Sequence, residues 1–259
     1  MSRAVLTQVG HVARRSVLRT LRQPSQVVPA LIFPLFLLAV NSGGLQKATN
    51  LPGFPTRSYL TFALAIPFMQ GALFSVMNAG TDLARDVETG FLNRLALTPL
   101  RGAALLAGLL AGALALGLLQ ATVYVLVGLA AGASFAAGVP GVLVIFALSL
   151  LMALGFGAVG LFVALRSGSG EVVQSMFPVF FVFLFLSSMA LPRNLIQTDW
   201  FREIATYNPV SYLIEAIRSL LVKGWDGEAL ALGFGIAAVL AVVAMVAASA
   251  ALKTRMVRT

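Results

Sequence analysis

The sequence predicts an all-α integral membrane protein with six transmembrane helices, cytoplasmic N- and C-termini, an amphipathic N-terminal interface helix and a short extracellular helix before the last span. Hydrophobic residues make up 59% of the 259 residues and charged residues 10%, whereas soluble domains are roughly 45–50% apolar and about 25% charged. A soluble helical domain of this length cannot bury that much apolar surface. No charged residue occurs between Gly102 and Leu165, and basic residues gather beside the apolar stretches.

Six apolar segments are the expected spans. A helix needs ~20 residues to cross ~30 Å of hydrocarbon, so the uncharged stretch holds two spans joined by a turn at residues 130–141, where Gly and Pro interrupt helical continuity. The expected transmembrane domain covers residues 25–252, and its spans are 27–40, 59–79, 103–130, 139–165, 172–191 and 229–252. The pairs Gly108/Gly112 and Gly128/Gly132 predict close helix packing.

The basic residues predict the orientation. An even number of spans puts both termini on one side, and twelve of the 18 Lys and Arg residues then lie on that side. The positive-inside rule places it in the cytoplasm, together with the tail at 253–259. A net charge of +9 is also typical of nucleic-acid-binding proteins, but the arginines flank apolar spans, and we expect no nucleic acid as partner.

Residues 1–24 predict an amphipathic helix that lies on the inner membrane surface, with its arginines toward anionic lipid head groups. The alternative is a disordered basic leader. The apolar face carries Val5, Val9 and Val12, and the basic face carries Arg15, Arg19 and Arg22.

A compact charged strip at residues 81–101 follows the second span. Val87, Phe91 and Leu95 share one helical face, which predicts a short cytoplasmic helix in which Gly90 marks a bend or a close contact. Thr98 and Pro99 fit a cap and first helical residue, so the third span starts there. The alternative is an ordinary solvated loop, because an exposed ion pair contributes only ~0–1 kcal/mol.

The loop at residues 192–228 predicts a short amphipathic helix on or dipping into the outer leaflet. Asn208 suits its cap and Pro209 its first turn. Glu215 and Arg218, at i and i+3, form a possible ion pair.

The sequence argues against catalysis by this chain. There is no Cys, His11 is the single histidine, and no carboxylate pair falls within a span, so no metal site is expected. Ser187 and Ser188 have no evident base. None of the nine acidic residues lies mid-span, which disfavours an ion-coupled secondary transporter. That transporter and a non-transporting membrane scaffold stay open as alternatives.

Two segments resemble the type-2 ABC exporter permeases, a family that includes drug-resistance and polysaccharide-export permeases. "DVETGFLNRLALTPL" is similar to the family's signature loop, and "YNPVSYLIEAIR" is similar to a segment before its last span. The first match rests on Asp86, Glu88, Gly90, Leu92, Arg94, Leu95, Thr98 and Pro99.

The resemblance implies a permease subunit of an ATP-driven exporter in the bacterial plasma membrane. The chain lacks a Gly-x-x-x-x-Gly-Lys-Ser/Thr loop, so ATP and Mg are expected on two copies of a cytoplasmic ATPase subunit, and no cofactor on this chain. A second permease copy, identical or a sibling, is expected to complete a dimer.

The resemblance also implies three groups of functional residues. The coupling helix, which would dock on the ATPase, comprises Asp82, Arg85, Asp86, Glu88, Gly90, Phe91, Arg94, Thr98 and Pro99. The extracellular gate comprises Asn208, Pro209, Tyr212, Glu215 and Arg218. Alternating access at the dimer interface would carry an amphipathic or lipid-like cargo along spans one, two and five, past Phe68, Met69, Gln70, Phe74, Asn78, Phe177, Phe181 and Phe185. The alternative is that these side chains face lipid or neighbouring helices.

Overall fold

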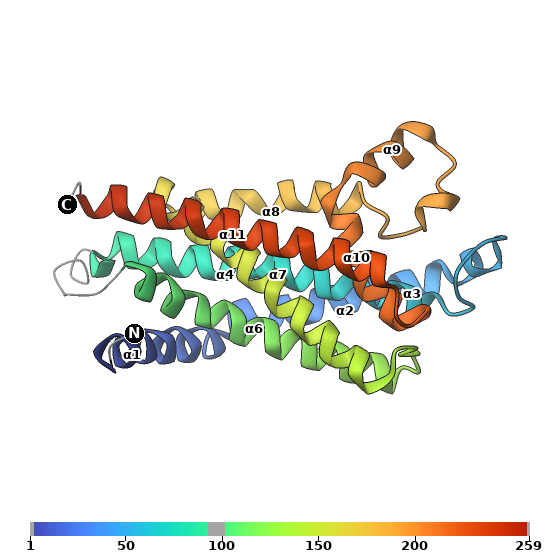
Figure 1. Ribbon diagram of the computed structural model, residues 1–259, viewed down its shortest axis with the longest axis horizontal. Coiled ribbons are helices and arrows are strands. Elements are labelled where there is room, and N and C mark those ends of the chain that lie inside the picture. Colours follow the sequence, from blue (N-terminus) through green and yellow to red (C-terminus); the bar gives the residue numbers. More distant parts are fainter. Residues whose placement is uncertain (1–2, 93–101, 258–259) are drawn as a thin grey trace.

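The computed structural model describes residues 3–92 and 102–257, and every regular element in those ranges is a helix. The long helices run along the long axis of a bundle, with α1 and the C-terminal end of α11 at the same end (Figure 1). The elements are α1 (Arg3–Leu21), α2 (Pro24–Gly44), α3 (Tyr59–Ala63), α4 (Ala65–Glu88), α6 (Gly102–Ala130), α7 (Gly138–Ser167), α8 (Gly170–Phe185), α9 (Asp199–Tyr207), α10 (Pro209–Val222) and α11 (Gly227–Val257), with short 3₁₀ turns η1 (Gln46–Asn50) and η2 (Arg193–Leu195).

Five stretches of the described chain are long and apolar enough to cross a membrane. They are Pro24–Gly44, Tyr59–Glu88, Ala104–Ala130, Gly138–Ser167 and Gly227–Arg255. The fifth predicted span corresponds to α8, which is apolar but has 16 residues. A helix of that length spans about 24 Å, short of a ~30 Å hydrocarbon core. The helical membrane class is therefore supported, and the count of six crossings stays a prediction.

A proline in α2 creates a polar link to α6. Pro34 has no backbone N–H, so the carbonyl of Ala30, four residues earlier, lacks its helical donor. The side-chain amide of Gln120 donates to that oxygen at 3.1 Å and the hydroxyl of Tyr124 donates at 2.7 Å. Side chains of α6 thus supply the hydrogen bonds that this carbonyl lacks, and they join α2 to α6 at Ala30.

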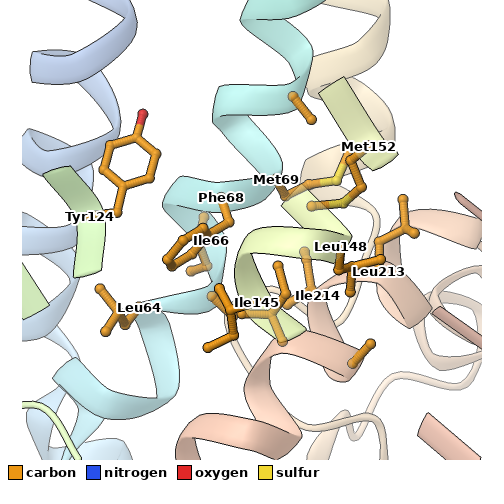
Figure 2. Close-up of a cluster of buried hydrophobic side chains, with 14 of the residues drawn as sticks. Leu64, Ile66, Phe68, Met69, Tyr124, Ile145, Leu148, Met152, Leu213 and Ile214 are labelled. Atoms are coloured by element: carbon orange, nitrogen blue, oxygen red, sulfur yellow. The ribbon is translucent and has the colours of Figure 1, made fainter. Parts of the chain in front are cut away.

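The hydrophobic core centres on α4. At the end of the bundle that holds α10, side chains from the α3–α4 junction meet α7 and α10 (Figure 2). The labelled residues include Leu64, Ile66, Phe68, Met69, Ile145, Leu148, Met152, Leu213 and Ile214. At the other end, Leu83, Leu106 and Leu161 belong to a second cluster, which joins α4, α6, α7 and α11.

Glycines allow the closest helix crossings. A Cβ on Gly160 of α7 would lie 2.1 Å from the backbone oxygen of Val76, and one on Gly80 of α4 would lie 2.9 Å from the backbone oxygen of Gly160. Real Cβ atoms do not approach backbone oxygens that closely, so α4 and α7 cross at a distance that no larger residue permits. Small residues serve this role between membrane helices.

The first glycine pair predicted to pack closely does so, and its partner is α1. Gly108 faces Val12, and Gly112 faces the hydroxyls of Ser16 and Thr20. The Ser16 hydroxyl also donates to the carbonyl of Leu109 at 2.9 Å. The N-terminal helix therefore lies in contact with α6. In the second predicted pair, only Gly128 packs closely, against Leu64. Gly132 instead has a φ of +81° in the turn after α6.

Candidate functional site

The charged strip begins as a direct continuation of the second span. Asp82, Arg85, Asp86 and Glu88 lie in the last two turns of α4, so the expected separate helix is wrong for these four residues. The predicted bend at Gly90 is confirmed, because Gly90 has a φ of +68° in the turn that follows α4. The predicted coupling residues Arg94, Thr98 and Pro99 lie outside the described residues.

Two acids of this strip bind two arginines of α1. We call Arg15, Arg19, Asp82 and Asp86 the α1–α4 clasp. Arg15 makes a bidentate pair with Asp86 at 2.9 and 3.0 Å, and Arg19 reaches Asp86 at 2.8 Å and Asp82 at 3.1 Å. The Asp86 side chain is only 5% exposed. Without its arginines the Asp86 carboxylate would be a buried charge without compensation, whereas the Arg15 side chain is 41% exposed.

The clasp corrects the expected direction of the N-terminal arginines. Arg15 and Arg19 were expected to face lipid head groups, yet both bind carboxylates of α4. The sequence did contain a signal for this contact: Arg15/Arg19 and Asp82/Asp86 are both i, i+4 pairs, so each presents its two charges on one helical face.

The remaining residues of the strip divide between surface and interior. Arg85 and Glu88 are exposed. The Glu88 carboxylate accepts a hydrogen bond at 3.3 Å from the backbone N–H of Gly170, the first residue of α8. The guanidinium carbon of Arg15 lies 3.9 Å from the centre of the Phe91 ring, a cation–π contact. The end of α4 is therefore tied to both α1 and α8, and Arg85 and Glu88 present charge outward.

At the opposite end of the bundle, α10 begins as predicted from Asn208 and Pro209. The Asn208 side chain accepts from the N–H of Val210 at 2.9 Å, as a cap, and donates to the carbonyls of Phe183 and Leu186. Ten of the 14 residues of α10 are buried. The helix therefore packs into the bundle and does not lie on its surface.

Arg218 lies inside this packing and does not pair with Glu215, so the predicted i, i+3 ion pair is wrong. Its guanidinium donates to the carbonyls of Phe62, Ser188 and Met189 at 2.9–3.1 Å. These carbonyls follow or end helices, where backbone acceptors have no helical donor. Burial lowers the pKa of Arg218 to about 10, so the side chain is still charged at neutral pH.

Glu215 instead binds Arg193 of η2. Arg193 Nε donates to Glu215 at 2.8 Å, and the Ser188 hydroxyl donates to the same carboxylate at 2.7 Å. The Arg193 guanidinium also stacks 4.3 Å from the ring centre of Tyr212. All five predicted gate residues are thus gathered around the junction of α8, η2 and α10.

An aromatic cluster joins α2, α4 and α8. Phe74 lies 6.5 Å from Phe33 and 5.3 Å from Phe177, ring centre to ring centre. Phe181 lies 5.9 Å from Phe33, 4.5 Å from Phe177 and 6.1 Å from Phe185. The structure therefore brings together four of the predicted pathway residues and adds Phe33, which sequence reasoning missed although Phe33 lies in the first span.

The other predicted pathway residues lie apart from this cluster. Phe68 packs edge-on against Tyr124 of α6, and Met69 lies in the core (Figure 2). Gln70 and Asn78 are buried on α4, and within the described chain both Gln70 amide atoms and the Asn78 oxygen have no hydrogen-bond partner. Residues 70, 74 and 78 follow one another at i+4 spacing, so these amides flank Phe74 along α4.

One known protein family matches most of this chain. The model of a family described as ABC-2 type transporter matches residues 7–222, a range that includes the clasp, the aromatic cluster and α10. The chain belongs to the ABC-2 type transporter family. It is therefore a multi-pass membrane chain of the permease type, as the sequence resemblance indicated.

Named relatives of this ABC-2 chain are transport permeases. A putative transport permease, ycf38, of Porphyra purpurea is 29% identical over 217 residues, which cover 83% of this chain and 74% of the relative. The daunorubicin resistance ABC transporter permease protein DrrB1 of Streptomyces coeruleorubidus is 28% identical over 233 residues, covering 86% and 79% of the two chains.

Proposed function

We propose that this chain is the permease subunit of an ATP-driven exporter and that a separate cytoplasmic ATPase subunit, in two copies, drives it. The observation that carries the proposal is the family match over residues 7–222. The sequence lacks a Gly-x-x-x-x-Gly-Lys-Ser/Thr loop, so a partner must supply the site that binds ATP and Mg.

The coupling surface is the exposed end of α4 and the segment that follows it. Arg85 and Glu88 would contact the ATPase, and the clasp would hold α1 to α4 as that contact moves. From Asp86 to Phe74 the chain is one continuous helix, about 18 Å long at ~1.5 Å per residue. A rigid α4 therefore links the coupling surface to the aromatic cluster.

The cargo pathway is the face made by α2, α4 and α8, where a second permease copy would complete it. Support comes from the exposed apolar side chains Ile32 and Phe36 on α2 and Phe183 and Phe185 on α8. An amphipathic or lipid-like cargo fits aromatic surface beside a few polar groups. The cargo would cross by alternating access, and the Gln70 amide and the Asn78 amide oxygen, which have no hydrogen-bond partner among the described residues, would offer hydrogen bonds once the helices part.

The junction of α8, η2 and α10 would form the outer gate. Arg218 and Asn208 donate there to backbone carbonyls, and Glu215 binds Arg193 and Ser188, so the helices there would move as a unit. We place the assembly in a bacterial plasma membrane, although a relative from Porphyra purpurea shows that the family is not confined to bacteria.

Two measurements test the proposed function. Purification of the tagged chain from its host in mild detergent is expected to recover a stoichiometric soluble ATPase and a second permease copy. Proteoliposomes of that complex are expected to move daunorubicin, used as an amphipathic probe, only when ATP is supplied.

The alternatives have different outcomes. Proton-coupled movement of the probe without ATP, by a chain that purifies alone, would establish the secondary transporter. Recovery of the complex without ATP-dependent movement of the probe or of lipids extracted from the host would favour the scaffold.

A further inference from the structure

A cleft that carries charged side chains and an apolar groove lie where α10 meets the start of α11, away from the proposed cargo pathway. Their lining includes Pro209, Glu215 and Arg218 of the proposed outer gate. Arg193, Glu215, Lys223 and Asp226 are among the residues that line the cleft, whose volume is about 560 Å³. A smaller hollow shares Arg193, Glu215 and Asp226 with this cleft and extends past Glu228 to Leu232. Leu232 also lines the groove, so the smaller hollow shares lining residues with both the cleft and the groove.

The groove is almost wholly apolar and has the length of one membrane leaflet. Leu232, Gly235, Ile236, Val239 and Val243 line it along α11, beside Pro209, in a volume of about 530 Å³. From residue 231 to residue 243 a helix rises about 18 Å, and half of a hydrocarbon core is ~15 Å deep. Val243 lies near the middle of α11, which runs from Gly227 to Val257. The groove therefore extends from the polar end of the helix to about its midpoint.

The charges beside the groove are of both signs. Arg193 and Glu215 pair with each other, and Arg218 is fully engaged with carbonyls. Among the described residues, Lys223, Asp226 and Glu228 form no ion pair. Lys223 and Glu228 are exposed, and Asp226 accepts a hydrogen bond from the backbone N–H of Ala229 at 3.1 Å. One basic and two acidic groups thus lie beside an apolar groove, and a head group that carries a phosphate and an amine offers each of them a partner of opposite charge.

We infer that this composite site binds one zwitterionic phospholipid from the leaflet at this end of the bundle. Its phosphate would lie near Lys223 and Arg193, its amine near Glu228, and one acyl chain would lie along α11. The inference depends only on the chain being embedded in a bilayer, and not on the direction or cargo of transport.

Gly235 provides the test. A Cβ on this glycine would meet nothing within 4 Å, because the residue faces the open groove. Gly233, two residues earlier, packs against Ala216 instead, with 2.3 Å between the two Cβ positions. A leucine at 235 would therefore fill the groove without disturbing the α10–α11 contact, and leucine is a better helix former than glycine.

The experiment compares retained lipid by native mass spectrometry, after the protein has been equilibrated with equal amounts of phosphatidylethanolamine and phosphatidylglycerol. Wild type is expected to retain one phosphatidylethanolamine. Gly235→Leu is expected to reduce that retention at least tenfold, while Gly10→Leu, at another helical glycine without neighbours, leaves it unchanged. The double variant Lys223→Gln/Glu228→Gln is expected to abolish the preference for phosphatidylethanolamine.

Three results would overturn the inference. One is equal retention by wild type and Gly235→Leu. Another is an equal loss in Gly10→Leu. The third is equal retention of phosphatidylglycerol by wild type, which would remove the role assigned to the two charges.

Discussion

At the scale of single residues, the structure depends on side chains that satisfy backbone carbonyls left open by helix ends and prolines. The Arg218 side chain donates hydrogen bonds to three carbonyls, and the Asn208 side chain donates to two near the end of α8. Gln120 and Tyr124 both donate to the carbonyl that Pro34 leaves without a helical donor. In the hydrocarbon region of a membrane, no water is present to donate a hydrogen bond to such carbonyls. Each of these side chains therefore stabilises backbone geometry as well as local packing.

Arg218→Met should destabilise the protein by about 3 kcal/mol or more, because it leaves three buried carbonyls without donors at ~1–3 kcal/mol each. The measurement is the thermal melting temperature in detergent. Arg202→Met is the control: Arg202 is exposed, pairs with the exposed Asp199 and makes one long hydrogen bond, 3.4 Å, to the carbonyl of Ile196, so its loss should cost about 1 kcal/mol. Equal shifts in the two variants would contradict the role assigned to Arg218.

At the scale of helices, two kinds of contact decide which elements lie together. Glycines set the crossing of α4 with α7 and the contact of α6 with α1. Charges then hold α1 on α4 through the clasp. Close packing and paired charge replace the hydrophobic driving force, which is absent between helices in lipid.

Gly160→Ala tests the α4–α7 crossing. The added Cβ would lie 2.1 Å from the Val76 oxygen, so the helices must separate, and we expect a loss of about 2 kcal/mol or more, at the upper end of the range for overpacking. Gly235→Ala is the matched control, since its Cβ meets nothing within 4 Å and it should be neutral or slightly stabilising. Thermal melting of both variants in the same detergent measures the difference; an unchanged Gly160→Ala protein would show that this crossing is not tight.

A charge exchange tests the clasp. Asp86→Arg should cost about 3–5 kcal/mol, the range for breaking a buried ion pair, because it faces Arg15 and Arg19 with a third positive charge. Combining it with Arg15→Asp and Arg19→Asp should recover part of that loss. The measurement is unfolding of purified single and combined variants in detergent. Strictly additive losses would contradict the clasp, because non-interacting sites add.

At the scale of the whole molecule, α1 and the C-terminal end of α11 lie at one end of the bundle, and α9 and α10 lie at the other (Figure 1). Cysteine labelling from either side of the membrane tests the predicted topology. Cysteines at Arg85 and Ser167 should be labelled only from the cytoplasm, and cysteines at Trp200 and Trp225 only from outside. All four positions are exposed, and the chain has no native Cys.

The pair Ser167 and Trp200 decides the number of spans, because α8 lies between them. Labelling of both positions from one side would mean that this 16-residue helix does not cross, and the count of six would be wrong. Labelling of Arg85 from outside would reverse the orientation.

The sequence by itself determined the class, most spans, the bend at Gly90 and the start of α10 at Asn208 and Pro209. These features depend on composition, hydrophobic periodicity and capping, which are properties of consecutive residues. Only the tertiary structure decided that Arg15 binds Asp86, 71 residues away, that Glu215 binds Arg193 and not Arg218, and that Phe68 and Met69 face the core while Phe74 joins Phe33. A charged side chain can pair with any opposite charge, and an apolar side chain can pack against any apolar neighbour. The packing of the helices therefore decides which of these partners each side chain contacts.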